Sequence, residues 1–203
     1  NTVLKTNNME IGSDEVIYNY ENNEIQYFKS GSVKTTNYNI NSIEFSHKLH
    51  TKNSYFNKNV ELKNEDYYII SENIHQLESK IIFCGNTSIK HIDFKINCKN
   101  GFLEKEKTLE LFDGVTVYFD NQAVTANRLT RNIQKEENYF ENDVHIVIDE
   151  TTHIFGEELC QINNTSTITK NSYIKLFNEK DTTFIKAKTI KIDQDENLSL
   201  DKN

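Results

Sequence analysis

Few side chains in this sequence are spaced for catalysis or metal binding. His47 and His50 are three residues apart, so on one β-strand they would point to opposite faces and could not share a metal ion. No H-E-x-x-H, P-loop or G-x-S-x-G motif occurs. Acidic pairs such as Glu157–Glu158 are typical of solvated strand ends and turns. We therefore expect no enzyme activity, no catalytic residue, no metal and no cofactor.

The cysteines do not form a recognisable framework. Cys84, Cys98 and Cys160 are odd in number and include no C-x-x-C pair, which excludes a complete set of disulfides, a zinc ribbon and a thioredoxin motif. We expect small buried thiols. A Cys84–Cys98 bridge stays open if the fold brings the two residues together.

Composition excludes further classes of protein. The 203 residues are enough to bury a core, yet only 36% are hydrophobic, a low share for a compact α/β enzyme. The net charge of −8 makes nucleic acid a poor partner. No apolar run of about 18 residues is present to span a membrane. Because the chain starts at Asn1 without Met or an apolar leader, we expect a mature or trimmed chain from which any signal peptide would already be gone.

A period of about 28 residues dominates the sequence. One motif is an aromatic residue, a turn-like polar stretch and a β-branched pair. Its copies begin 28, 27, 29 and 28 residues apart, at Phe28, Phe56, Phe83, Phe112 and Phe140, with a degenerate copy at Ile168. A second motif, aliphatic-x-small-x-x-apolar, begins at Ile11, Ile40, Ile69, Ile96, Val124, Ile154 and Ile185. Two motifs with one period indicate a repeat architecture.

Each repeat has the pattern of two antiparallel strands. Clusters of Asn and Asp, which favour turns, recur about every 14 residues. Between them apolar and polar residues alternate, as at Val115, Val117 and Phe119, which is typical of half-buried strands. The sequence therefore predicts an all-β chain of about thirteen strands, with no helix longer than two turns.

The second motif predicts that the strands bend. Ile69 and Ser71 are two residues apart and share a face, whereas Ile74 lies three residues beyond Ser71 and falls on the other face. A change of parity at a small residue indicates a bend or a bulge. We expect the sheet to fold along a crease, with apolar residues on its two sides facing each other across a trough. The small residues at the crease would be Ser13, Ser42, Ser71, Cys98, Ala126, Gly156 and Ala187.

The repeated unit, Gly/Asn-Val-x-Ile, a turn and Leu-x-Ala-x-x-Leu, resembles the OstA-like (LptA–LptC) lipopolysaccharide-transport family. The similarity is greatest over residues 112–192. There, residues 113–117 followed by 124–129 make one copy of the unit, and residues 141–146 followed by 156–159 make the next. The repeat phase covers nearly the whole chain. The sequence departs from the family pattern at residues 96–101, where Gly101 stands at an apolar position.

The resemblance implies a repetitive antiparallel β-jellyroll, or β-taco, in one domain over residues 1–203. It implies a non-enzymatic periplasmic carrier or bridge in the cell envelope of a Gram-negative bacterium. Such a protein shields the lipid A acyl chains of lipopolysaccharide on the way to the outer membrane. The interior residues expected to face inward and contact lipid are Phe56, Val60, Leu62, Ile69, Ile74, Phe83, Ile89, Val115, Val117, Phe119, Val124, Leu129, Val144, Ile146, Ile148, Ile154 and Leu159.

Partners and alternatives follow from the same pattern. We expect open strand edges near residues 11–18 and 185–192, where other Lpt components of the same fold, or a second copy, would add strands head to tail. A structural or adhesive β-solenoid that binds protein or glycan is the alternative, and a repeat enzyme resembling pectate lyase is a third possibility. A carrier should present an accessible apolar interior, whereas a structural solenoid should be packed shut.

Overall fold

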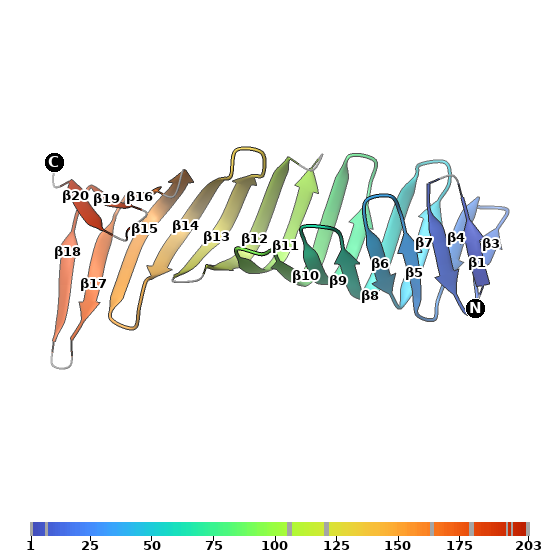
Figure 1. The fold of residues 1–203 in the computed structure, drawn as a ribbon, viewed down its shortest axis with the longest axis horizontal. Coiled ribbons are helices and arrows are strands. Elements are labelled where there is room, and N and C mark those ends of the chain that lie inside the picture. The colour runs from blue at the N-terminus through green and yellow to red at the C-terminus, as the bar shows by residue number, and fades with distance from the viewer. Residues whose placement is uncertain are drawn as a thin grey trace. The chain divides into compact units, whose positions relative to one another are not determined.

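The computed structural model describes residues 2–6, 8–104, 107–119, 122–162, 165–178, 181–193, 195 and 197–201. These residues form β-strands, turns and bends but no helix (Figure 1), which confirms the all-β prediction. They form 20 strands rather than about thirteen, because toward the ends of the chain the two sides of the sheet separate and each strand is divided at the crease. The described residues thus contain no helix that could cross a membrane. The chain divides into two compact units. A single domain over residues 1–203 stays a prediction.

Unit 1 comprises Asn1–Ile92 and Lys99–Lys105. All of its strand pairs with a defined register are antiparallel. The strands are β1 (Thr2–Lys5), β2 (Glu10–Ser13), β3 (Ile17–Asn19), β4 (Glu24–Tyr27), β5 (Gly31–Lys34), β6 (Asn39–Ser42), β7 (Glu44–Lys48), β8 (Asn53–Lys63), β9 (Tyr68–Gln76), β10 (Lys80–Lys90) and the second half of β11 (Lys95–Glu104).

Unit 2 comprises Asp93–Cys98 and Glu106–Asn203. Its pairs of defined register are also antiparallel. It contains the first half of β11, followed by β12 (Thr108–Tyr118), β13 (Ala123–Asn132), β14 (Glu137–Val147), β15 (Thr152–Ile162), β16 (Thr165–Thr169), β17 (Tyr173–Phe177), β18 (Thr182–Lys186), β19 (Thr189–Ile192) and β20 (Leu198–Asp201).

Left-handed residues bend every second long strand and create a crease in each unit, as a pair in β8, β12 and β14 and as Gly85 alone in β10. The pairing register shifts between Asn57 and Val60 in β8, between Phe112 and Val115 in β12, and between Glu141 and Val144 in β14. Two residues with positive φ fill each gap, and a further pair lies between β16 and β17. The pairs are Lys58 and Asn59, Asp113 and Gly114, Asn142 and Asp143, and Lys170 and Asn171. Asn, Asp and Gly tolerate this conformation best, which explains their recurrence here.

The crease separates two walls of the sheet, which we call wall A and wall B. Wall A contains the half of each bulged strand that precedes the left-handed pair, and wall B contains the half that follows it. The long strands β8, β9, β10, β12, β13, β14 and β15 run through both walls. Beyond β8 and β15 the walls separate: β7 and β4 continue wall A in unit 1 while β6, β5 and β2 continue wall B, and in unit 2 β16 and β17 divide in the same way.

Small residues do line the crease, as the sequence predicts, but the extra residues lie in the neighbouring strand. In β9 the side chains of Ile69, Ser71 and Ile74 are all buried, which confirms the change of parity. Ser71 is paired with Val60, just after the left-handed pair of β8. In unit 2 Gly156 takes the same place, and a Cβ there would lie 2.4 Å from Cγ2 of Ile168, so only glycine fits.

The crease also fixes which aromatic residues are buried. Phe56 and Phe83 lie inside, as predicted, and so does Phe140, but Phe28 is 57% exposed and Phe112 is half-buried. Each buried aromatic or aliphatic residue stands two positions before the crease. That position is occupied by Tyr27 in the first copy and by Leu111 in the fourth, and both are fully buried. The motif is therefore shifted by one residue in these two copies.

Substitution of Gly114 tests the crease. Gly114 has a φ of +77°, and no heavy atom lies within 4 Å of the position of its missing Cβ. Gly114→Ala should therefore lower the free energy of unfolding by about 1 kcal/mol through the backbone conformation alone. Urea unfolding measures the change. Gly12→Ala, on the outer face of β2, is the control. Its backbone is not left-handed, and the added Cβ would lie 3.3 Å from Oγ of Ser32, a contact that a small movement of the serine side chain relieves, so little effect is expected. Equal losses for both variants would contradict the role of the crease.

The shift of the motif makes a second prediction. Leu111→Ala removes a fully buried side chain and should cost about 2–5 kcal/mol in unfolding free energy. Phe112→Ala removes a larger side chain from the outer face and should cost clearly less. Thermal or urea unfolding of both variants measures the two losses of stability. A larger loss for Phe112→Ala would show that Phe112, and not Leu111, occupies the inward position of this copy.

Candidate functional site

The candidate site of each unit is its apolar interior, formed by one row of side chains on each wall. In unit 1 the row on wall A is largely aromatic. Ring centroids of Tyr27 and Phe45 are 5.1 Å apart, and those of Phe45 and Phe56 are 5.0 Å apart. The register extends this row through Ile74 to Phe83. The facing row on wall B is aliphatic and consists of Ile11, Val33, Ile40, Leu62, Ile69 and Ile89.

Unit 2 repeats this arrangement with more leucine. Its wall A row consists of Leu111, Leu129, Phe140, Leu159, Ile168 and Ile190. Its wall B row consists of Val117, Val124, Ile146, Ile154 and Ile174. Every one of these side chains is buried. Since no helix covers the sheet in the described residues, the two rows must bury each other.

Most of the predicted interior residues are indeed buried. Fifteen of the seventeen are 5% exposed or less. The two exceptions, Phe119 and Ile148, are half-buried near the ends of β12 and β14, where the walls reach solvent. Burial places the fifteen inside, but contact with lipid stays a prediction. The fifteen are Phe56, Val60, Leu62, Ile69, Ile74, Phe83, Ile89, Val115, Val117, Val124, Leu129, Val144, Ile146, Ile154 and Leu159.

Among the described residues the middle of each interior is closed to solvent. Phe56, Val60 and Ile74 in unit 1 and Val115 and Ile146 in unit 2 have no exposed surface. A carrier is expected to present an accessible apolar interior, so a closed interior favours a packed structural repeat over an open carrier. A carrier with this structure must therefore separate its walls in order to bind a chain.

Polar side chains occupy the inward row farthest from the crease on wall A. In unit 1 the Nδ1 atom of His47 lies 2.9 Å from Oγ of Ser54, and both side chains are buried. In unit 2 the corresponding residues include Arg131 and Asn138, which are joined by a hydrogen bond of 2.7 Å. Apolar periodicity gives no signal for these residues, although their two-residue spacing from Phe45, Phe56, Leu129 and Phe140 places them on the inner face.

The residues first considered for metal chemistry do not come together. His47 is buried, whereas Nε2 of His50 lies 3.1 Å from Nδ2 of Asn23 at an exposed turn. Among the described residues no group of three or more His, Cys, Asp or Glu side chains could hold a metal ion.

All three cysteines are free thiols, so the Cys84–Cys98 bridge does not form. Cys98 is buried at the crease. Burial, with a smaller contribution from the charge of Asp113, raises the pKa of Cys98 to about 12. This thiol therefore stays protonated and is a poor nucleophile.

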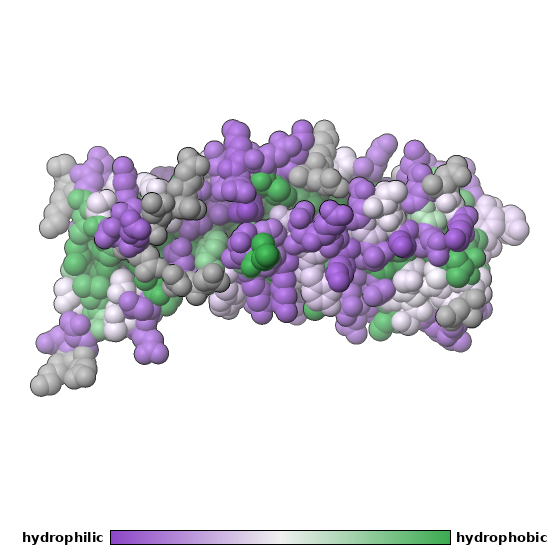
Figure 2. Space-filling model, in the orientation of Figure 1, coloured by the Kyte–Doolittle hydropathy of each residue, from purple (hydrophilic) through white to green (hydrophobic). Residues whose placement is uncertain are grey.

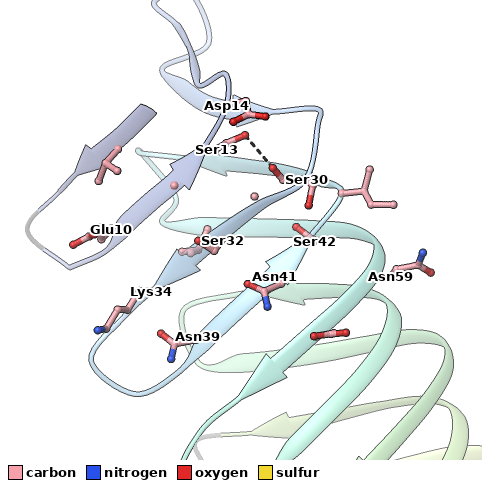
Figure 3. A pocket seen from close by; sticks show the side chains of 16 residues that line it. Glu10, Ser13, Asp14, Ser30, Ser32, Lys34, Asn39, Asn41, Ser42 and Asn59 are labelled. Atoms are coloured by element: carbon pink, nitrogen blue, oxygen red, sulfur yellow. Dashed lines mark hydrogen bonds between the residues drawn. The ribbon is translucent and has the colours of Figure 1, made fainter. Parts of the chain in front are cut away.

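The outer face of unit 1 carries a polar groove of about 870 Å³ (Figure 3). Short side chains form its floor, since Gly12, Ser32 and Asn41 are in register across β2, β5 and β6. Glu10 and Lys34 face each other at one side. The groove lies over β2, β5 and β6, and its lining also includes Val33 of the wall B row.

The outer face of unit 2 carries an aromatic cluster near β18. The rings of His145 and Phe155 stack at 4.3 Å, those of Phe155 and Tyr173 stack at 4.8 Å, and Phe184 is 60% exposed. Figure 2 shows hydrophobic surface gathered over β17 and β18. Burial, together with the charge of His153, lowers the pKa of His145.

The open strand edges differ in part from the prediction. Ile11 lies in β2, which is paired on both sides with β1 and β5, and β19 is likewise paired with β16 and β20. Within the described residues, β1, β3, β18 and β20 each have one pairing partner. The last strands of each unit are divided at the crease, so each wall ends in an edge of its own.

No family model and no curated protein matches this chain. The resemblance to the OstA-like family therefore rests on the motifs quoted above, and the function is argued from the geometry of the interior.

The buried imidazole of His47 makes stability depend on pH. Burial lowers the pKa of His47 below its usual 6.5, so the unfolded chain takes up a proton at a higher pH than the folded chain does. Stability should be unaffected above about pH 7 and should fall as the pH drops through about 6.5 toward the pKa of the folded state. In His47→Gln this decline should become smaller.

Urea unfolding at pH 7.5 and pH 5.5 measures the decline. His50→Gln removes an exposed imidazole in the same unit and should leave the decline unchanged. An undiminished decline in His47→Gln would show that the buried imidazole is not its source.

Proposed function

We propose that this protein is a non-enzymatic carrier that holds the acyl chains of lipopolysaccharide between its two walls. One observation carries the proposal: each unit has two facing apolar rows on walls that are joined along a crease. In the described residues the backbone hydrogen bonds run between neighbouring strands or across the crease, and none joins the rows directly. The resemblance to the OstA-like family supports the same function and a periplasmic location.

According to this proposal, the interior can open with the loss of few hydrogen bonds. A small change of backbone angles at the left-handed pairs, such as Lys58 with Asn59, would move the walls apart and leave the strand ladders intact. Separation of the walls exposes apolar surface to water, which costs a free energy of about 25 cal/mol per Å². Acyl chains that enter the gap cover the same surface again. Binding would then exchange wall-to-wall contact for wall-to-lipid contact.

Such a carrier is passive. Apolar contact is non-directional, so chains could move along the rows without a catalytic step. Net movement against a gradient would need an energy source elsewhere, because a binding surface shifts populations only by its own differential affinity.

The open edges support a second part of the proposal, docking of same-fold partners by strand addition. Among the described residues β18 pairs on one side only and adjoins the aromatic cluster of unit 2, and β1 and β3 likewise each have one partner in unit 1. An exposed edge beside an apolar patch favours docking of another strand. Other Lpt components or a second copy of this chain would fit there.

A structural or adhesive repeat protein is the second candidate. The closed interior favours it, and the polar groove over Gly12, Ser32 and Asn41 offers Ser, Asn and carboxylate groups to a glycan or a peptide. In this case lipid would not enter between the walls.

Photo-crosslinking distinguishes the two candidates. A photoreactive phenylalanine analogue at Phe140 would face the interior, and the same analogue at Tyr139 would face solvent, since Phe140 is 1% exposed and Tyr139 38% exposed. The carrier predicts crosslinks to labelled lipopolysaccharide from position 140 and few from position 139. Equal labelling at the two positions would contradict it.

A charged interior provides the matching loss of function. Val117→Asp places a carboxylate in the buried row of wall B, whereas Thr116→Asp places it on the outer face. Crosslinking from position 140 should fall with Val117→Asp and persist with Thr116→Asp. A thermal melt must accompany the assay, because an unpaired buried carboxylate is destabilising. A folded Val117→Asp protein that crosslinks as well as the parent would reject the carrier.

A further inference from the structure

A row of polar side chains crosses the inner face of wall A in unit 2. Arg131, Asn138, Gln161 and Ser166 are register partners on β13, β14, β15 and β16. Each lies two residues from a buried apolar side chain of the adjacent row, so all four point inward. Asn138 and Ser166 are buried, while Arg131 and Gln161 are half-buried. The row stands at the rim of the apolar interior.

Hydrogen bonds run along this row in one direction. Nη1 of Arg131 donates to Oδ1 of Asn138 at 2.7 Å. Nδ2 of Asn138 donates to Oε1 of Gln161 at 3.3 Å, and Nε2 of Gln161 donates to Oγ of Ser166 at 3.1 Å. The carbonyl oxygens of both amides are thereby engaged within the row. At the Arg131 end the row presents N–H donors and a positive charge.

The charge of Arg131 has no carboxylate partner among the described residues. Its guanidinium carbon lies 4.9 Å from the centre of the Phe94 ring, and its Nε atom is buried without a hydrogen bond. Arg128, three residues earlier on the outer face, is different. Its Nε is also unbonded, but its Nη atoms lie 2.9 Å from Glu110 and 3.5 Å from Glu141. These are the only arginines of a chain with net charge −8, and only Arg128 is neutralised by carboxylates in the part of the chain that the structure describes.

We infer that Arg131 binds the oxyanion head group of an amphiphile whose apolar chain lies between the walls of unit 2. The inference rests on the proposed function, because it requires the interior to accept a chain. A planar guanidinium suits a carboxylate or a phosphate, which it binds with two parallel hydrogen bonds. The next row toward the crease is apolar and includes Leu129 and Phe140, about 7 Å farther along each strand. Charge and apolar surface are therefore arranged as the head and tail of an amphiphile require.

The test compares two probes that differ only in the charge of the head group. Dansyl-labelled undecanoic acid carries a carboxylate, and its methyl amide is uncharged. Fluorescence titration of the parent should give an affinity about ten- to hundredfold higher for the acid, as expected for hydrogen bonds to a charged group. Arg131→Gln should abolish this preference. Arg131→Lys should keep part of it, because the charge remains while the bidentate geometry is lost.

Arg128→Gln is the matched control, since it removes the same side chain from the outer face of the same strand, and it should keep the full preference. Circular dichroism melts confirm that each variant is folded. A preference for the acid that persists in folded Arg131→Gln would overturn the inference. So would displacement of the acid by millimolar inorganic phosphate alone, which would indicate a site for free anions.

The same titration separates this inference from the function on which it rests. If the parent binds the acid and the amide equally, the head-group site is wrong but the carrier stands. If the parent binds neither probe, the carrier is wrong and the head-group site is rejected with it.

Discussion

The left-handed pair at each crease is the constraint on which the rest of the structure depends. Two consecutive residues with positive φ are unfavourable for most side chains. From Asp113 with Gly114 onward this chain places such pairs about 28 residues apart, and in unit 1 Lys58 with Asn59 is followed by Gly85 alone. Each pair bends its strand, shifts the register against the next strand and fixes which side chains point inward on both walls. Without the bend, a single sheet would expose one apolar face. With it, the sheet buries that face against itself.

Much of this organisation could be predicted from residue types and spacing. The period, the change of parity at Ser71 and the inward direction of Phe56, Val117 and Ile146 follow from the alternation of apolar and polar residues, because burial of one face is what selects that alternation. Turn positions follow from Asn and Asp, as where the Asn64 side chain accepts a hydrogen bond from the backbone N–H of Asp66.

The remaining features depend on information that periodicity does not carry. Phe28 and Phe112 match the motif by type, but the inward position is counted from the crease, and Tyr27 and Leu111 occupy it. The division of the last strands of each unit into separate edges depends on how all the strands of the sheet pair, which the sequence of one strand does not determine. The inward direction of Arg131 conflicts with its polarity, so apolar periodicity gives no signal for it, and only its two-residue spacing from Leu129 indicates the inner face. Closure of the interior depends on how far the walls splay, which no local pattern determines.

The positions of the creases also constrain how such a chain can change in length. Because side chains alternate faces along a strand, the gain or loss of one residue between two creases reverses every later side chain as far as the next bend. Removal or duplication of about 28 residues, one bulged strand with its plain neighbour, keeps every row in phase. Genes for chains of this kind should therefore vary by whole repeats and seldom by single codons within strands, and the length of the apolar rows would change in steps of two strands.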